Sequence, residues 1–427
     1  MNRALSTGIG KLVKTATRFR PHGGQALPGL VVEKLFPSYF ADMVEQLPEG
    51  VIVITGTNGK TTTTKMVVEL LEAAGKEVLT NPTGSNLIRG IVSSLLTGAD
   101  WRGKLPHDIA VFEIDEAYAR HFVKQVRPRW VLALNVSRDQ LDRFGEVDVV
   151  AELVGTTMRA ATEGVVTNAN DPRLAKIGRE LAAKISVSYF GVAANLESFF
   201  PSDNELVSIR SKDNQTIADP QPLVPNVELT AFQGQTASYA IAGKTYQTSL
   251  QLTGQHNFQN AAAAVALVRS LLPEIDAAQL IDWLGNVGTA FGRGEIFTLK
   301  NGSQLQLVLV KNPASFRQTL ASYLTEDIAT MIVINDNYAD SRDVSWLWDV
   351  DFVPLKGRQI TATSGSRAAD MALRLHYADI KVTTVEPDID KALQAFCKLP
   401  DRKIVVATYT AMLHLYEELT AKAGESL

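Results

Sequence analysis

Apolar runs and helical periodicities alternate along roughly the first 190 residues of the chain. The run at 51–54 consists of four β-branched apolar residues, which is typical of a buried parallel strand. Apolar residues from Met66 to Leu71 then recur at helical spacing and predict a helix that ends near Gly75. Further strands are expected at 77–80, 108–114, 130–136, 164–170 and 185–191. This alternation predicts an α/β fold with a mostly parallel, doubly wound sheet.

The pattern changes between residues 192 and 252 to short segments of alternating polarity separated by turn residues, which predicts a β-rich insertion. A strong helical pattern follows at 256–272, and strand and helix patterns alternate again toward the C-terminus. We therefore expect a lead-in at 1–45, an α/β domain at 46–297 that contains the insertion, and a smaller α/β C-terminal domain at 298–427.

Composition narrows the class of protein. Of 427 residues, 45% are hydrophobic and 21% charged, which excludes a disordered or collagen-like chain. A net charge of −4 provides no overall field that favours nucleic acid. The single cysteine, Cys397, excludes an internal disulfide framework and a cysteine-rich zinc site, and it favours a reducing, cytoplasmic compartment. Cys397 lies in a helical pattern without the glycines of a nucleophile turn, so we interpret it as a packing residue.

The N-terminal segment has the spacing of a short amphipathic helix at Leu5, Ile9, Leu12 and Val13. Basic residues interrupt its apolar positions, so it makes a poor secretory signal, and no stretch approaches the length of a membrane span. The favoured interpretation is a surface helix that packs on its own domain. The alternative is at most a peripheral contact with anionic lipid at the inner face of the membrane.

The sequence GTNGKT at 56–61 follows the first strand and opens a helix, which is the context of a phosphate-binding loop. Its spacing, GxxGKT, is shorter than the general GxxxxGK[ST] pattern. In such a loop Lys60 neutralises phosphate charge, and the Thr61 hydroxyl holds Mg²⁺. We expect ATP and Mg²⁺ as cofactors, and phosphate binding through Gly56, Thr57, Asn58, Gly59, Lys60, Thr61 and Thr62.

This short loop resembles that of the Mur ligase superfamily, which includes the folylpolyglutamate synthases. Further segments resemble Mur motifs in the same order: VFEIDEA (111–117), NVSRDQLDRFG (135–145), NANDP (168–172), HNFQNAAAA (256–264) and GRGE (292–295). The resemblance implies that Glu113 binds Mg²⁺, that Asp171 lies near phosphate, that Asn260 meets adenine, and that Arg293 lies near the phosphates and is catalytic. Taken singly, Glu113 also suits a polar strand end, Asn260 a helix cap, and Arg293 a surface ion pair.

One segment departs from the Mur pattern. Asp139 and Gln140 stand where many Mur ligases have Asp-His, so a histidine metal ligand is absent at that position and a second Mg²⁺ is in doubt. Asp139 and Asp142 also suit solvated or helix-capping acids.

Strings in the C-terminal third resemble the MurT family, the ligase subunits of lipid II isoglutaminyl synthases: LVLVKNPASF (307–316), INDNYADSRDVSWLWDVDF (334–352), GSRAADMALRLHYA (365–378) and ATYTAML (407–413). The early position of the phosphate loop also leaves little room for a UDP-binding domain. The resemblance implies ATP-dependent phosphorylation of the α-carboxylate of D-glutamate in the lipid II stem. Ammonia from a GatD-like class I glutaminase partner then displaces phosphate to give D-isoglutamine.

The family also implies that an aspartate of the C-terminal domain completes the partner's Cys-His pair. Five candidates follow a predicted strand: Asp336, Asp340, Asp343, Asp349 and Asp351. We favour Asp349 as the catalytic acid because it lies in an apolar setting, with Asp340 and Asp336 next, while Asp343 suits a cap of the VSWLW turn. A purely structural role for Asp349, and either a core or a partner-facing role for Trp346 and Trp348, remain open.

Many MurT sequences hold a four-cysteine zinc ribbon where this chain has its insertion at 192–252, which contains no cysteine. We therefore expect no structural zinc, and an insertion held by strand pairing. Two alternatives to the amidating ligase remain: a stand-alone Mur or folylpolyglutamate-type amino acid ligase, and a nucleotide-binding assembly subunit without ligase activity. The intact Lys60, Thr61 and Glu113 speak against the second alternative.

Overall fold

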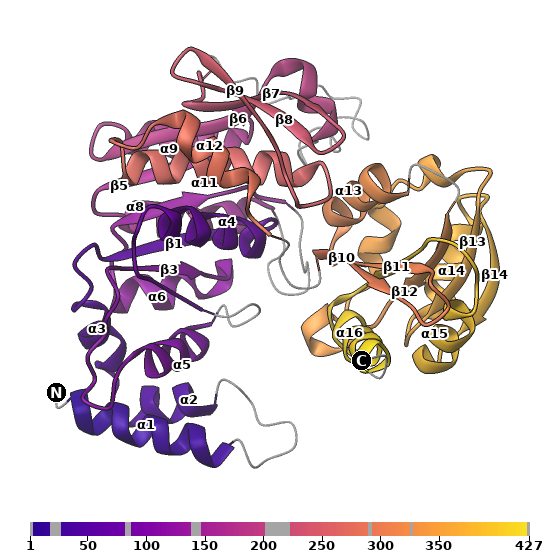
Figure 1. Cartoon of the computed structure of the whole chain (residues 1–427), viewed down its shortest axis with the longest axis horizontal. Coiled ribbons are helices and arrows are strands. Elements are labelled where there is room, and N and C mark those ends of the chain that lie inside the picture. The colour runs from indigo at the N-terminus through magenta and orange to yellow at the C-terminus, as the bar shows by residue number, and fades with distance from the viewer. Residues whose placement is uncertain are drawn as a thin grey trace. The chain divides into compact units, whose positions relative to one another are not determined.

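The structure is a computed structural model, and it describes residues 3–17, 27–81, 87–137, 147–200, 223–288, 293–324 and 328–424. The described residues divide into two compact units, which are treated separately (Figure 1). Unit 1 takes the described residues of 1–137, 147–251 and 258–287. Unit 2 takes 252–257 and the described residues from 293 onward, together with Gly288.

Unit 1 is built on a nine-stranded sheet in the order β2-β3-β1-β4-β5-β6-β7-β8-β9. Neighbouring strands from β2 to β7 pair in parallel, and β7, β8 and β9 form antiparallel hairpins. The strands are β1 Val51–Thr55, β2 Val78–Thr80, β3 Ile109–Glu113, β4 Trp130–Ala133, β5 Gly164–Asn168, β6 Ser186–Val192, β7 Val227–Gln233, β8 Thr236–Ile241 and β9 Lys244–Ser249. The predicted α/β class is confirmed, and the six strands predicted before residue 192 all form.

The β-rich insertion extends this same sheet. Strand β7 pairs in parallel with β6, so the hairpins add three strands to one edge. Their alternating burial, with Ala237, Tyr239 and Ile241 of β8 pointing inward, is the half-buried pattern that the sequence indicates. The described part of the insertion is thus held by strand pairing and packing.

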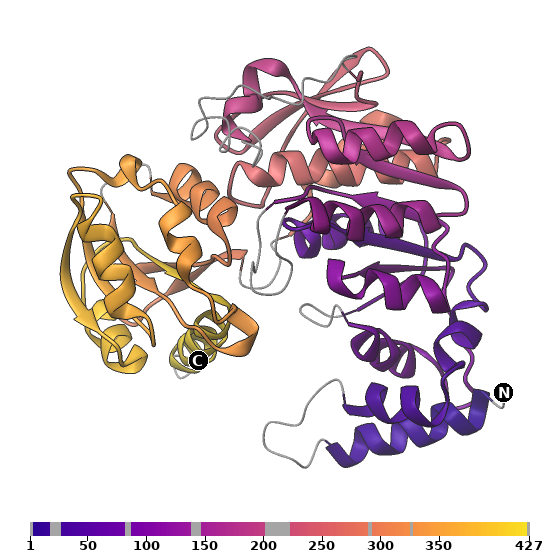
Figure 2. The same cartoon turned by 180° about the vertical axis from the view of Figure 1, so that it is seen from behind.

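Helices cover both faces of the sheet in unit 1. Right-handed crossovers place α4 on one face and α6, α8 and α9 on the other, and α12 contacts α4 (Figures 1 and 2). The helices are α1 Arg3–Thr17, α2 Leu27–Leu35, α3 Tyr39–Val44, α4 Lys60–Ala73, α5 Ile88–Gly98, α6 Ala119–Gln125, α8 Val147–Ala160, α9 Pro172–Leu181, α11 His256–Leu271 and α12 Ala277–Gly285, with short 3₁₀ turns η1 Glu116–Tyr118 and η2 Ala194–Phe199. The chain order therefore brings the loop after β1 to the carboxyl edge of a parallel sheet, where α/β sites form.

Unit 2 contains a six-stranded sheet in the order β10-β11-β15-β12-β13-β14, parallel except for the β10–β11 pair. The strands are β10 Arg293–Thr298, β11 Gln304–Leu309, β12 Ala329–Val333, β13 Gln359–Ser364, β14 Lys381–Glu386 and β15 Lys403–Ala407. The helices are α13 Pro313–Tyr323, α14 Ala368–His376, α15 Ile389–Cys397 and α16 Tyr409–Gly424, with turns η3 Tyr338–Asp340, η4 Ser345–Asp349 and η5 Val353–Leu355.

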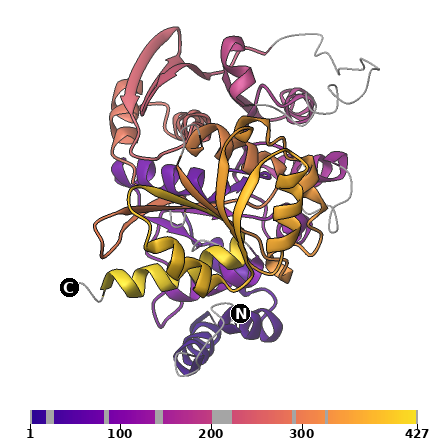
Figure 3. The same cartoon turned by 90° about the vertical axis from the view of Figure 1, so that its right-hand side faces the viewer.

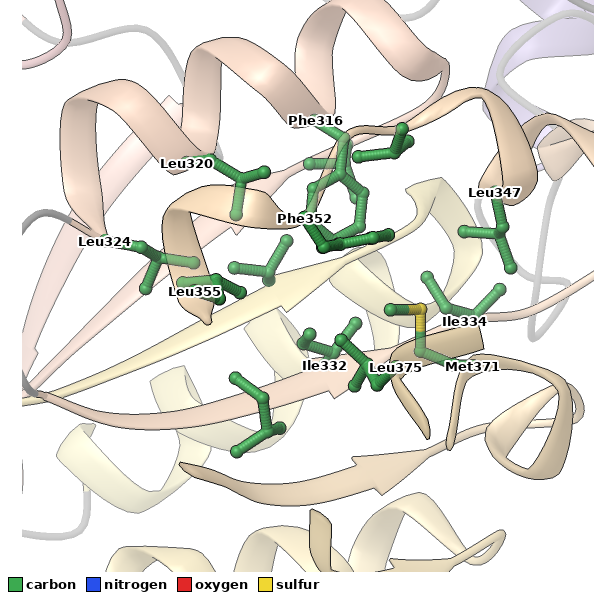
Figure 4. Close-up of a cluster of buried hydrophobic side chains, with 14 of the residues drawn as sticks. Phe316, Leu320, Leu324, Ile332, Ile334, Leu347, Phe352, Leu355, Met371 and Leu375 are labelled. Atoms are coloured by element: carbon green, nitrogen blue, oxygen red, sulfur yellow. The ribbon is translucent and has the colours of Figure 1, made fainter. Parts of the chain in front are cut away.

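One face of this second sheet packs against α13, α14 and the turns η4 and η5. Figure 4 shows the resulting core, in which Phe316 and Phe352 meet edge to face with ring centroids 5.1 Å apart. Leu347 from the DVSWLWD string and Met371 from α14 pack into the same cluster. The distinctive string at 343–349 is therefore anchored by its own apolar residues, which fixes the loop that carries the aspartates.

Candidate active site

The glycines of the phosphate loop adopt backbone conformations that side chains disfavour. Gly56 has φ +128° and Gly59, which caps the N-terminus of α4, has φ +85°. A Cβ at Gly59 would lie 2.4 Å from Oδ1 of Asn260, and one at Gly56 would lie 2.9 Å from the carbonyl oxygen of Asn135. The loop thus needs both glycines, and the structure brings the Asn260 amide of α11 against it.

Thr57 and Asn58 fasten the loop to the segment that follows β4. The amide N–H of Asn58 donates to Oδ1 of Asn135 (2.9 Å), and Nδ2 of Asn135 donates back to the Asn58 carbonyl (3.0 Å). Nδ2 of Asn58 donates to Oγ of Ser137 (3.0 Å), while the Ser137 N–H donates to Oγ1 of Thr57 (3.1 Å). These two loop side chains hold the loop in shape, a role that the sequence did not indicate.

Lys60 forms a buried ion pair with a residue that sequence reasoning missed. Nζ of Lys60 lies 3.1 Å from Oε2 of Glu116, with the two residues only 7% and 4% exposed. Nζ also donates to the Gly56 carbonyl. Glu116 belongs to the VFEIDEA segment at 111–117, where only the first glutamate was selected, and the second acid of its Asp-Glu pair is the signal that could have identified it.

Thr61 and Glu113 meet beside this ion pair, as the metal prediction requires. Oγ1 of Thr61 donates to Oε2 of Glu113 at 2.9 Å, and Glu113 is 6% exposed at the carboxyl end of β3. Asn81 fixes the Glu113 backbone by accepting from its N–H (2.9 Å) and donating to its carbonyl (3.0 Å). One hydroxyl and one carboxylate suit Mg²⁺, which takes its remaining ligands from water and nucleotide phosphates.

The described residues contain no group of three or more His, Cys, Asp or Glu side chains suited to hold a metal ion. The Thr61–Glu113 pair therefore fits an ion that arrives with its nucleotide and does not fit a fixed protein cage. Thr62, the next loop residue, is 4% exposed within α4.

The carboxylate of Asp171 accepts hydrogen bonds from three backbone N–H groups. One carboxylate oxygen accepts from the N–H groups of Arg173 (3.1 Å) and Leu174 (3.2 Å), which caps α9, and the other accepts from the N–H of Val136 (2.8 Å). Burial raises the pKa of Asp171, although these hydrogen bonds act in the opposite direction. The carboxylate ties α9 to the segment after β4, and its predicted contact with phosphate stays a prediction.

Four other residues selected from the sequence have side chains that the structure does not describe. Arg293 begins β10 in unit 2, where its backbone pairs with Val308, and its side chain lies outside what the structure describes. Asp139, Gln140 and Asp142 lie outside the described residues. Their roles at the phosphates and the metal stay predictions.

The aspartates after β12 have separate partners within unit 2. Asp340, 4% exposed, accepts from the N–H of Thr410 (2.7 Å) and from its hydroxyl at the start of α16, and burial raises the pKa of its carboxyl. Asp336 accepts from the Ser366 hydroxyl (2.6 Å) and from Nε of Arg367 (2.8 Å). These contacts, the serine hydrogen bond foremost, lower the pKa of Asp336.

The two aspartates beside the turns η4 and η5 bind backbone N–H groups of those turns. Asp343 accepts from the N–H of Ser345 (2.8 Å), the first residue of η4, and Asp351 accepts from the N–H of Val353 (2.9 Å), the first residue of η5. Each acid lies one position before the N-cap of its turn. Each of these acids stabilises a local turn.

Asp349 lies half-buried at the end of η4, where its backbone carbonyl accepts from Arg317 (3.4 Å). The two neighbouring tryptophans differ. Trp346 is 7% exposed and packs near Phe316 in the core, whereas Trp348 is 47% exposed. Asp349 directly follows the exposed Trp348 and precedes the buried Val350, at the surface of unit 2.

Comparisons with known proteins agree with this architecture. Residues 54–268 match the Mur ligase middle domain, and residues 309–412 match the MurT ligase C-terminal domain. The chain resembles the MurF ligase of Acinetobacter baumannii with a TM-score of 0.68 at 21% identity, over 92% of this chain and 80% of that one. It resembles a Thermotoga maritima MurF ligase in complex with ADP with a TM-score of 0.66 at 16% identity, over 93% and 85%.

Fold, phosphate loop and middle-domain match together define a ligase of the Mur type. Within that class, the chain is 30% identical to a Streptococcus pneumoniae protein over 98% of both chains, and 28% identical to one from Staphylococcus aureus strain COL over 96% of both. Both relatives are named lipid II isoglutaminyl synthase (glutamine-hydrolyzing) subunit MurT. The chain belongs to the MurT family.

Proposed function

We propose that this protein is the synthetase subunit of a lipid II isoglutaminyl synthase. It would use ATP to phosphorylate the α-carboxylate of D-glutamate in the lipid II stem peptide, after which ammonia displaces phosphate to give D-isoglutamine for peptidoglycan synthesis. The observation that carries the proposal is the pairing of Lys60 with Glu116 beside Thr61 and Glu113, in a chain that aligns with MurT relatives over nearly its whole length.

The chemistry suits these residues. A carboxylate oxygen of the substrate attacks the terminal phosphorus of ATP and ADP leaves, so negative charge must be neutralised at the phosphates. Lys60 supplies a fixed cation there, and Thr61 and Glu113 would hold the Mg²⁺ that shields the same charge. Nitrogen of ammonia then bonds to the acyl carbon as phosphate departs. Neither step needs a nucleophile from the protein.

The nitrogen source is proposed to be a second subunit. Cys397 is partly buried on the last turn of α15, which is not the setting of a glutaminase nucleophile. We propose a GatD-like class I glutaminase partner that docks on unit 2, with Asp349 orienting the histidine of its Cys-His pair. The half-buried position of Asp349 next to the exposed Trp348 supports this assignment, because interfaces favour such aromatic neighbours.

The place of action is proposed to be the cytoplasm, at the inner face of the membrane where a lipid-linked precursor is accessible. Among the described residues, no helix is both long and apolar enough to cross a bilayer.

Amidation of lipid II by the purified chain tests the proposal. With ATP and Mg²⁺, ammonium should support product formation without a partner, whereas glutamine should support it only after a GatD-like subunit is added. Mass spectrometry of the stem peptide detects the exchange of hydroxyl for amide. Product from glutamine with this chain alone contradicts the two-subunit scheme, and ligation of an amino acid in place of ammonia would make the chain a stand-alone ligase.

A further inference from the structure

Helix α1 packs on its own unit through its small and polar face. Ser6, Thr7 and Gly10 are buried, and Oγ1 of Thr7 lies 3.1 Å from the Tyr39 hydroxyl. A Cβ on Gly10 would lie 2.4 Å from the side chain of Leu96 on α5, so α1 approaches α5 closely at this glycine. The expectation that α1 packs on its own domain holds, but of the four apolar residues that define its predicted stripe, Ile9 and Val13 are only half-buried and Leu5 and Leu12 are exposed.

Two large apolar residues of α1, Leu5 and Leu12, face outward. Leu5 is 56% exposed and Leu12 is 64% exposed, and Ile9 and Ala16 continue the same helical stripe at spacings of three and four residues. An ordinary surface helix turns such a stripe toward the core. Figures 1, 2 and 3 show α1 with α2 at the outer edge of unit 1, away from the sheet. The stripe is therefore an apolar surface on the unit's outermost helical layer.

A basic, aromatic loop runs beside this helix. Trp101 is 62% exposed, with Nζ of Lys11 lying 5.4 Å from its ring centroid, and a Cβ on Gly103 would lie 2.8 Å from the Arg3 carbonyl. Asp100 holds the loop in shape by accepting from the N–H groups of Arg102 and Lys104, each at 2.8 Å. The side chains of Arg102 and Lys104 are thereby presented to solvent in a fixed turn.

We infer that α1 and the loop at 100–104 form a docking surface for an anionic lipid bilayer. Exposed leucines on a helix lying flat, a tryptophan at the edge, and nearby lysines and arginines are the features that place a protein in the headgroup region. The exposed cations of this surface are Arg102 and Lys104, in a chain whose overall charge is −4. The cations of α1 contact their own unit: Arg3 pairs with Glu45, Lys11 donates to the Ala99 carbonyl, and Lys14 donates to Oγ1 of Thr97. The local positive charge complements an anionic surface.

The same charges argue against a second copy of the chain as the occupant. A symmetric dimer through this surface would place each cluster of cations against its own copy, and like charges facing each other across an interface are unfavourable. A bilayer rich in phosphatidylglycerol has no such conflict. Docking would also bring the protein to the lipid-linked substrate of the proposed function, although the inference rests on the surface alone.

Flotation of the full-length chain with liposomes tests the inference, without lipid II or ATP. The vesicles are phosphatidylcholine alone, or phosphatidylcholine with phosphatidylglycerol at 70:30. Binding to the anionic vesicles should be at least tenfold tighter and should weaken in high salt. The combined variant Leu5→Ser, Leu12→Ser, Trp101→Ser should lose at least tenfold of that binding. The double variant Arg102→Gln, Lys104→Gln should bind the anionic vesicles about 25-fold more weakly, which is near fivefold for each cation removed.

Matched controls lie elsewhere on unit 1. Val149→Ser removes an apolar residue that is 50% exposed on α8, and Lys176→Gln with Lys184→Gln removes two exposed cations; both should bind as the parent does. Thermal unfolding midpoints establish that each variant is folded. Failure of the parent to bind anionic vesicles overturns the inference, as does undiminished binding by the combined variant. A parent dimer in analytical ultracentrifugation that this variant converts to monomer also overturns it.

A second assay separates this inference from the proposed function. Amidation of lipid II in detergent micelles reports the active site alone, whereas amidation in anionic vesicles also requires docking. The combined variant should keep parental activity in micelles and lose at least tenfold in vesicles. If the parent lacks activity in micelles but binds vesicles, the proposed function fails and the docking surface stands.

Discussion

The phosphate loop of unit 1 and the aspartate segment of unit 2 occupy equivalent places in two parallel sheets, yet they differ in how their chemistry is encoded. Each follows the carboxyl end of a central strand, β1 and β12 respectively. The phosphate loop functions through the path of its backbone. Gly56 and Gly59 make this path possible, and the adjacent strand and helix fix it. The aspartate segment presents five chemically identical side chains, of which Asp336 and Asp340 depend on partners far away in the sequence. Two others, Asp343 and Asp351, bind backbone N–H groups two residues away.

The electrostatics of the two sites show the same contrast. In unit 1 the buried cation Lys60 faces the buried acid Glu116 across 56 residues of sequence. In unit 2, Asp336 has the cation Arg367 as its partner, whereas Asp340 accepts from the N–H and hydroxyl groups of Thr410. A motif read from neighbouring residues can locate the first member of such a pair, but the second member emerges only from the fold.

The largest effect is expected from Lys60→Ala. Without its cation at the phosphates, ATP-dependent amidation should fall by about 10³-fold or more, with ammonium and with glutamine alike. Lys65→Ala is the matched control, since Lys65 lies on the same helix and pairs with Glu69 near the surface. Initial rates of isoglutamine formation measure both. Equal losses for the two variants would show that the phosphate loop is not the site of phosphoryl transfer.

The rate of amidation should fall roughly 10- to 100-fold in Glu116→Gln. Glu116 positions Lys60, and the substitution leaves the Lys60 cation buried beside a neutral amide. The loss should include a raised KM for ATP, and Glu116→Asp should restore part of it. Glu69→Gln is the control. A lower unfolding temperature with an unchanged KM and kcat would make the ion pair structural only.

The sequence predicted unit 1 well because its signals are local. Six strands and the helix at 256–271 follow from apolar runs and helical spacing. Glu113, which accepts from Thr61, was selected through the resemblance to the Mur ligases and not through a local pattern. Sequence reasoning missed Glu116, whose local signal is only that it is the second acid of an Asp-Glu pair, and whose pairing with Lys60 arises from the fold. It also could not predict that α1 turns Leu5 and Leu12 outward, because periodicity defines a stripe without indicating which face is covered.

Asp349→Asn should separate the two nitrogen sources. With a GatD-like partner present, glutamine-dependent amidation should fall on the order of a hundredfold, because the partner's histidine loses its orienting acid, while ammonium-dependent amidation should remain within about twofold. Asp351→Asn is the control on the same segment, since Asp351 accepts from a backbone N–H of a local turn. A loss confined to Asp336→Asn or Asp340→Asn would transfer the role to that residue, and an equal loss with ammonium would place Asp349 in the synthetase site.

Asp340→Ala is expected to act on stability. It removes the acceptor of the N–H and hydroxyl groups of the half-buried Thr410 at the start of α16, at a cost of about 2 kcal/mol. Asp370→Ala, which removes an exposed acid from α14, should change the free energy of unfolding by less than about 0.5 kcal/mol. Urea denaturation measures both, and equal effects would contradict the capping role of Asp340.

The smallest effect concerns the order in which two acids of one segment titrate. Burial raises the pKa of Asp340, and the Ser366 and Arg367 contacts lower that of Asp336, so in carboxyl-detected NMR Asp340 should titrate at the higher pH.

The contributions of the two acids to the free energy of unfolding depend on pH with opposite signs. The contribution of Asp336 is present above its unfolded pKa and is lost as pH falls through its depressed folded pKa, so Asp336→Asn should cost less in acid. For Asp340 the folded state binds the proton more tightly than the unfolded state does, so the free energy of unfolding falls as pH rises through the raised folded pKa. Asp340→Asn should therefore lower the free energy of unfolding most at acidic pH. The reverse titration order would mean that the hydrogen bonds from Thr410 outweigh burial, and the contrast between the two acids would disappear.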